Sequence, residues 1–244
     1  MRIRPALSAS LIVVVAASGV ANAATHKKAK PKPPPPVCNI VTDPAGDAPF
    51  DPSLGLGLSA GNDDNADILS ADIASDAKNV TAVIRVKSLA SPDSAWPEAH
   101  LYMLTWSVPG HDTPVYLAGT VDPNPASAGY GPQFVFGDGG STAGGTLLYY
   151  NIDFGATVKG TVDATKNTVT LSVPIAQLKG YGTFTPGTHF TGINVQTQQV
   201  VNGPTFGQNL PAAGGSAGWG WQSDTADGVK DYVAGTPSCV KPGS

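Results

Sequence analysis

The stretch of sequence most informative about the fold is residues 79–89, which read N-V-T-A-V-I-R-V-K-S-L. Apolar side chains occupy every second position from Val80 to Val86, and the other face carries Thr81, Val83, Arg85 and Lys87. Because successive side chains of a strand point to opposite faces, this period of two predicts a half-buried β-strand.

The same alternation recurs along the chain at short intervals. We expect further strands over residues 100–108, 115–121, 133–136, 146–154, 157–163, 168–174 and 190–201. The turn at 164–167 predicts that 157–174 forms a hairpin. Clusters rich in Gly, Pro, Asn and Asp, such as 123–125 and 137–140, are expected to connect the strands, and only 175–179 and 95–99 suit a helical turn. The pattern predicts an all-β fold, a single antiparallel β-sandwich of jelly-roll type with about nine or ten strands.

The N-terminal region predicts export. Residues 1–23 combine a positive start, an apolar run over 6–20 and the small-x-small sequence Ala21-Asn22-Ala23, the pattern of a cleaved secretory signal. Residues 24–36 carry four lysines and a run of four prolines, which predicts a basic, disordered tether. The sandwich domain is then expected to span 37–244, and the protein to be secreted.

The net charge of the predicted domain limits the kinds of partner that it could bind. Six of the 14 basic residues lie within the first 32 positions, which leaves eight against 18 acidic residues, of which Glu98 is the only Glu. An acidic domain argues against a nucleic-acid partner, because a phosphate backbone needs a basic surface. The absence of an 18-residue apolar run after residue 23 argues against a membrane-spanning helix.

The two cysteines flank the predicted domain. Cys38 follows the proline run, and Cys239 lies near the C-terminus. In an exported chain, two cysteines allow one intramolecular pairing, so we expect a Cys38–Cys239 disulfide that joins the two ends of the fold.

Two segments carry a family resemblance. Residues 66–90 contain two consecutive strand patterns, and residues 160–178 contain a hairpin pattern that ends in V-P-I-x-x-L. This order resembles family 9 carbohydrate-binding modules and the related DOMON-like sandwiches of secreted bacterial proteins. The resemblance implies a β-sandwich with structural calcium and a ligand site at one sheet or loop end.

Three acidic turns are candidate calcium ligands. Their side chains are Asp43 and Asp47 in the first turn, Asp63, Asn65 and Asp67 in the second, and Asp224 and Asp227 in the third. The D-x-N-x-D spacing of the second turn can direct alternate oxygens to one cation. A disulfide between the chain ends would also bring the first and third turns close together. The alternative is that these residues form Asx-turns and keep the protein soluble.

Aromatic residues are candidates for ligand binding. Trp219 and Trp221 would share one face of a strand, where exposed rings could stack on a sugar, and Tyr149 is a further candidate. The alternative is that they fill the core, as we expect of Trp106. No H-E-x-x-H motif occurs, and we expect no enzyme.

Two hypotheses about function follow. The first is a noncatalytic binding module for a polysaccharide or a cell-surface component. The second is a structural or accessory extracellular domain that acts through protein partners. Exposed aromatic residues would favour the first, and buried ones the second.

Overall fold

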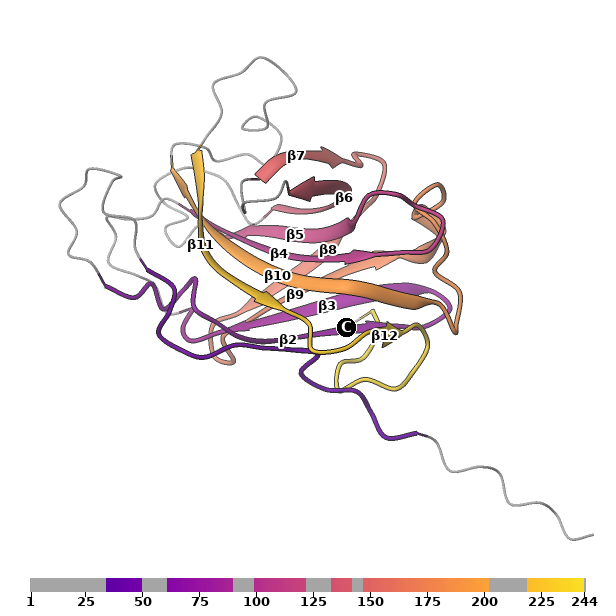
Figure 1. Cartoon of the computed structure of the whole chain (residues 1–244), viewed down its shortest axis with the longest axis horizontal. Helices are drawn as coiled ribbons and strands as arrows, with labels where there is room; N and C mark the ends of the chain where they lie inside the picture. Colours follow the sequence, from indigo (N-terminus) through magenta and orange to yellow (C-terminus); the bar gives the residue numbers. More distant parts are fainter. Residues whose placement is uncertain are drawn as a thin grey trace, which may run out of the picture. The chain divides into compact units, whose positions relative to one another are not determined.

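Two antiparallel sheets pack face to face in the computed structural model (Figure 1). The structure describes residues 34–49, 61–89, 99–121, 133–141, 147–201 and 219–243. The predicted signal segment, 1–23, and most of the predicted tether, 24–36, lie outside these residues. Among the described residues, no helix is long and apolar enough to cross a membrane.

The first sheet has five strands and the second has seven. The order in the first is β1 (Val41–Thr42), β2 (Ile68–Ser75), β3 (Asn79–Val86), β9 (Thr168–Pro174) and β8 (Lys159–Asp163). The order in the second is β11 (Trp219–Asp227), β10 (His189–Val201), β4 (Ala99–Ser107), β5 (Val115–Val121), β6 (Gln133–Ser141) and β7 (Leu147–Ile152), and β12 (Tyr232–Val233) also pairs with β10. The expected antiparallel β-sandwich is therefore confirmed.

The ten longer strands match the predicted number. The two further strands, β1 and β12, are two residues long each, too short to show alternation. A 3-10 turn, η2 (Ile175–Gln177), lies within the helical turn expected at 175–179. Of the helical turn expected at 95–99, the structure describes only Ala99, which begins β4, so at this residue the prediction is wrong.

The expected loop at 137–140 is instead part of β6. Its glycines make this possible, because the Tyr116 hydroxyl crosses over Gly137 to donate a hydrogen bond to the Asn151 carbonyl at 3.0 Å. A Cβ at Gly137 would collide with both Asn151 and Tyr116. Here glycine serves close approach of neighbouring strands rather than a turn.

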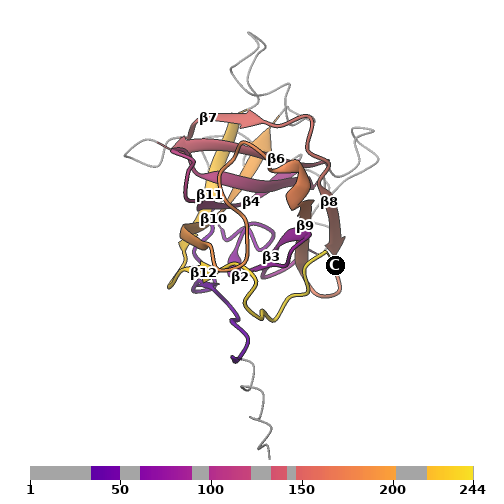
Figure 2. The same cartoon turned by 90° about the vertical axis from the view of Figure 1, so that its right-hand side faces the viewer.

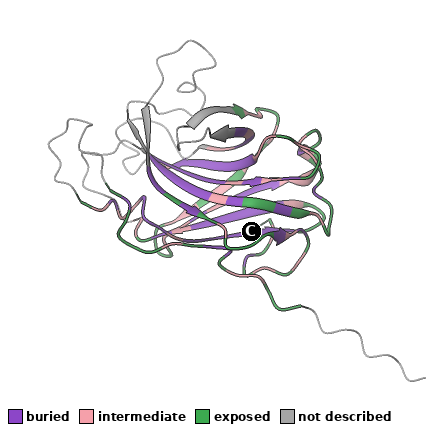
Figure 3. Cartoon of the chain, in the orientation of Figure 1, coloured by how far each residue is buried: buried purple, intermediate pink, exposed green. Residues whose placement is uncertain are grey.

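The core lies between the sheets and follows the predicted alternation of β3 (Figure 3). Val80, Ala82, Ile84 and Val86 are all buried in it. The second sheet contributes large side chains from β4, β5 and β10. These include Tyr102, Leu104, Trp106, Leu117, Phe190 and Val195.

The opposite face of β3 is more buried than its sequence indicates. Thr81 and Val83 are buried, because the C-terminal segment lies against this face. Val240 packs with Ala74 and Val83, and the Gly243 amide donates to the Thr81 hydroxyl oxygen at 2.8 Å. This cover comes from residues about 160 positions away, which no local pattern reports.

The chain ends meet beside the first sheet, where Cys38 and Cys239 form the expected disulfide. Residues 37–47, here called the N-terminal strap, run between the C-terminal segment and β11. Val37 forms a parallel bridge with Ser238, and Val41 forms an antiparallel bridge with Gly228. The strap thus crosses from one chain end to the second sheet.

Trp106 provides a test of core packing. Its side chain is fully buried, its ring centroid lies 5.9 Å from that of Phe190, and its Nε1 has no hydrogen-bond partner among the described residues. Trp106→Ala should lower the free energy of unfolding by about 3 to 5 kcal/mol. Trp106→Phe should cost about 1.5 kcal/mol or less, because it keeps most of the packing and removes an unsatisfied N–H. Urea unfolding measures both, and equal losses would contradict this account of the core.

Candidate metal centre

Three carboxylates from distant parts of the chain meet at one edge of the sandwich. One oxygen each of Asp43, Asp47 and Asp224 can be chosen so that all lie within 4.8 Å of one another. Asp43 and Asp47 lie on the N-terminal strap, directly after β1, and Asp224 lies in β11. The strap brings them together because Val41 bridges to Gly228 at the end of β11.

The turn that carries Asp43 and Asp47 depends on Gly46. Its φ of +98° lies in the left-handed region that favours glycine. The Gly46 amide donates to Oδ2 of Asp67 at 2.8 Å, so the turn closes around that carboxylate. The Asp43 amide donates to the Leu69 carbonyl at 3.2 Å, which fixes the start of the turn against β2.

Both carboxylate oxygens of Asp224 accept hydrogen bonds from the backbone. Its Oδ2 accepts a hydrogen bond from the Ile68 amide and its Oδ1 one from the Thr225 amide, both at 2.7 Å. Burial raises the pKa of Asp224 to about 7, and the charges of Asp43 and Asp47 add to the rise. Burial also raises the pKa of Asp43, followed by the charge of Asp47. The charged form of each carboxylate is therefore disfavoured in this environment.

Two buried carboxylate oxygens at this edge have no hydrogen-bond partner among the described residues. They are Oδ2 of Asp43 and Oδ1 of Asp67. Asp67 is fully buried, and its other oxygen accepts from Gly46 and from Nδ2 of Asn62, the latter at 2.7 Å. An orphaned buried carboxylate oxygen is costly unless a cation or a proton satisfies it.

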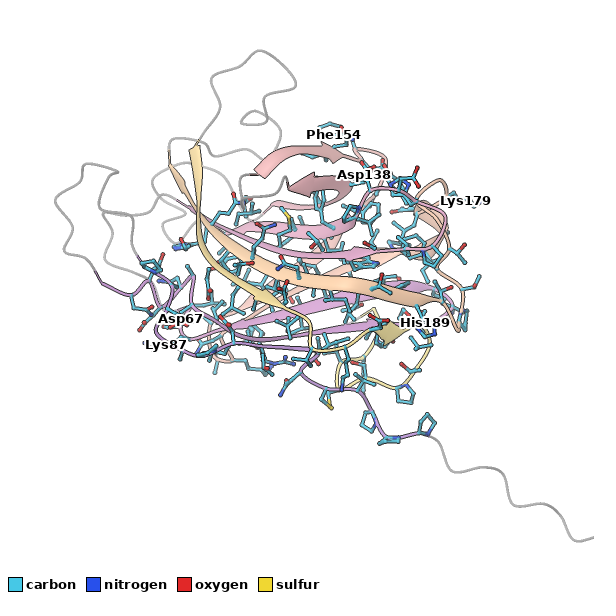
Figure 4. The ribbon with its side chains drawn as sticks, in the orientation of Figure 1. Asp67, Lys87, Asp138, Phe154, Lys179 and His189 are labelled. Carbon is cyan, nitrogen blue, oxygen red and sulfur yellow. A yellow bond between two sulfur atoms is a disulfide. The ribbon has the colours of Figure 1, made fainter. Side chains whose placement is uncertain are left out.

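The ammonium group of Lys87 lies near Asp67 and Asp64. Figure 4 shows Lys87 beside Asp67 at the same end of the molecule. The Lys87 Nζ lies 2.7 Å from Oδ1 of Asp64 and 3.8 Å from Oδ2 of Asp67. Its hydrogen bond lowers the pKa of Asp64, so Lys87 is engaged mainly with the exposed carboxylate.

The other predicted metal ligands make contacts of their own. Oδ2 of Asp63 lies 2.7 Å from Nε2 of His100, and both side chains are buried. The Asn65 carbonyl accepts from the Tyr102 hydroxyl at 2.9 Å, and Asp227 is exposed and accepts from Nδ2 of Asn194 at 3.0 Å. The structure thus groups the first and third acidic turns, with Asp67 of the second beside them.

The predicted aromatic residues lie on strands whose backbone alone is described there. In the register of the second sheet, Trp219 pairs with Val201 and Trp221 with Gln199, and Tyr149 of β7 pairs with Gly140. The side chains of these three predicted ligand-binding residues lie outside what the structure describes.

Sequence reasoning missed Asn62 and the role of His100. Asn62 accepts from the Ala48 amide at 3.0 Å and donates to Asp64 and Asp67, so it links the strap to the second acidic turn. His100 lies 37 residues from its partner Asp63. No spacing signal connects such distant residues.

A second ionisable group lies around β6 and the turns after β4 and η2. Nε2 of His111 is 2.9 Å from Oδ2 of Asp138, and Tyr181 packs edge-on against both His111 and Phe136. Burial and Asp153 raise the pKa of Tyr181 to about 12. These contacts join the β4–β5 turn to β6, so we interpret this group as part of the packing between them.

Comparison with protein-family models gives no match for this chain, and comparison with curated proteins gives none either. Any function therefore has to be argued from the residues and their geometry.

The raised pKa of Asp224 predicts how stability depends on pH when no metal is bound. Its pKa near 7 in the folded state exceeds its ordinary value of about 3.8, so between these values the folded protein holds more proton than the unfolded chain. Stability from this group should therefore fall as pH rises from about 4 to about 7, and stay level above.

Asp224→Asn should remove this part of the dependence. Urea midpoints in chelator at about pH 5 and about pH 8 should fall more for the wild type than for the variant. Equal falls in the two proteins would show that the carboxylate does not titrate as described.

Proposed function

We propose that this chain is a secreted, noncatalytic β-sandwich binding module whose closed fold is stabilised by calcium at Asp43, Asp47 and Asp224. The observation that carries the calcium site is the convergence of these three carboxylates within 4.8 Å. The unpartnered buried oxygen of Asp67 supports it independently, because Asp67 lies inside the same turn.

The donor atoms favour calcium over other metals. All of them are carboxylate oxygens, which suit a hard cation, whereas zinc sites are built mainly from His and Cys. Calcium takes six to eight oxygen ligands in variable geometry, and magnesium needs a regular octahedron. A site assembled from a turn and a strand, with Asp224 and Asp67 already fixed by amides, fits the tolerant ion.

Calcium would offset the repulsion that closing the fold creates. The strap can lie against β11 only if Asp43 and Asp47 approach Asp224, so a bound cation stabilises the closed arrangement. Extracellular calcium modules work at dissociation constants of about 0.1 to 1 mM. The predicted signal segment supports secretion, and the disulfide fits an oxidising compartment.

A polysaccharide or a cell-surface component is the partner that we propose for the module. This part rests on Trp219 and Trp221, whose spacing of two residues predicts that both rings lie on one face of the strand. Tyr149 in β7, at the opposite edge of the second sheet, is less suited to join them in one platform. An accessory domain with protein partners is the alternative if the rings are not available to a ligand.

Calcium titration tests the metal site. Calcium at about 10 mM should raise the melting temperature of the wild type relative to chelator by about 3 to 10 °C. This follows from about 1.4 to 2.7 kcal/mol at a ten- to hundredfold excess over the dissociation constant, and about 2 to 4 °C per kcal/mol for a domain of this size. Asp224→Asn should abolish most of the rise.

Asp112→Asn is the matched control. It removes the same charge as Asp224→Asn, but at an exposed residue in the turn before β5, away from the site. Its response to calcium should equal that of the wild type. Equal melting temperatures of the wild type in calcium and in chelator would contradict the site. If Asp224→Asn keeps the full rise in melting temperature with calcium, the ion binds at a different site.

The double substitution Trp219→Ala and Trp221→Ala tests the partner. Exposed rings add stacking to a ligand and little to the core, so the variant should lose polysaccharide binding while its urea midpoint changes little. Buried rings would instead cost about 3 to 5 kcal/mol each. Pull-down on a polysaccharide panel, read beside unfolding curves, separates the two outcomes, and an unfolded variant would contradict the binding platform.

A further inference from the structure

The N-terminal strap carries both Cys38 and the two carboxylates Asp43 and Asp47. Near the disulfide, the Val37 amide donates to the Pro237 carbonyl at 2.8 Å and the Cys239 amide donates to the Val37 carbonyl at 3.3 Å. Nearer the carboxylates, the Val229 amide donates to the Ile40 carbonyl at 2.9 Å. A covalent link and a metal site therefore act on one short piece of chain.

The C-terminal partner of the strap is itself fastened to the first sheet. The Gly235 amide donates to the Ser75 hydroxyl oxygen at 3.1 Å, and the Ser75 amide donates to the Tyr232 hydroxyl oxygen at 2.9 Å. Val240 and Gly243 add the contacts with Val83 and Thr81 described above. The disulfide thus attaches the strap to an anchored segment.

The strap forms a short β-ladder with the first sheet. Its strand, β1, has two residues, and it pairs with β2 only at Val41–Ala71 and Thr42–Ser70. The Asn39 amide also donates to Oδ1 of Asp72. Ile40 and Val41 are buried in the core and the Asp43 amide bonds to Leu69, so the disulfide adds to these contacts in positioning Asp43 and Asp47 opposite Asp224.

We propose that the Cys38–Cys239 disulfide sets the affinity of the cation site, so that the site binds calcium tightly in the oxidised protein and weakly in the reduced one. This inference rests on the calcium site proposed above. A dithiol reductant would donate two electrons and two protons to the S–S bond, giving two cysteine thiols and the oxidised reductant. The freed strap would then lose the alignment of its two carboxylates with Asp224.

Coupling of this kind is reciprocal. If the disulfide strengthens calcium binding by a given factor, calcium must favour the disulfide over the dithiol by the same factor. Both directions can be measured on the same protein.

Calorimetric calcium titration of the wild type and of the double variant Cys38→Ser and Cys239→Ser tests the first direction. The dissociation constant should rise about tenfold in the double variant, within the usual range of coupling between sites. Leu117→Ala is the control for general loss of stability, because Leu117 is buried in β5 of the second sheet. Its dissociation constant should stay within about twofold of the wild type.

Equilibration of the wild type with graded dithiothreitol tests the second direction, and it decides the matter if the double variant does not fold. Millimolar calcium should raise the dithiol concentration needed for half-reduction about tenfold over chelator. Two results would overturn this inference alone, provided that the wild type binds calcium. One is an equal calcium affinity of the wild type and the folded double variant. The other is a reduction midpoint of the wild type that calcium does not shift. A wild type that takes up no calcium would overturn the site and the inference together.

Discussion

The crossing of the N-terminal strap between the C-terminal segment and β11 is the constraint on which the rest of this edge depends. It pairs Val37 with Ser238, links Cys38 to Cys239 and bridges Val41 to Gly228. These contacts join the strap to the C-terminal segment and to the end of β11, and Figure 2 shows the indigo N-terminal segment leaving the sandwich below β2. Because the strap continues directly into the turn at 43–47, this closure also forces two carboxylates toward Asp224. The acidic group is therefore a consequence of how the sandwich closes.

That closure has an electrostatic cost, which explains the state of the carboxylates. Burial and mutual repulsion raise the pKa values of Asp43 and Asp224, and two buried oxygens in the group have no donor among the described residues. Lys87 balances the negative charge of Asp64, to which it binds. A proton or a cation is needed to balance the negative charges of Asp43, Asp47 and Asp224. The calcium ion proposed above would supply this balance.

Local patterns in the sequence predicted the strands well because alternation reports burial directly. Residues 79–86 became β3, and the 157–174 hairpin became β8 and β9. The disulfide was predictable because two cysteines allow one pairing. That pairing also predicted that the first and third acidic turns lie close together, and Asp43, Asp47 and Asp224 do so. The D-x-N-x-D spacing could not report that Asp63 contacts His100, which lies on β4, 37 residues away. The burial of Thr81 likewise depends on the distant C-terminal segment.

A crystal structure of the oxidised protein grown in millimolar calcium tests the central claim most directly. The account predicts a strong density peak between the strap and β11, with carboxylate oxygens of Asp43, Asp47 and Asp224 at about 2.3 to 2.6 Å from it. An anomalous signal would identify the ion. Density for water alone among these three carboxylates, at saturating calcium and neutral pH, would contradict the account.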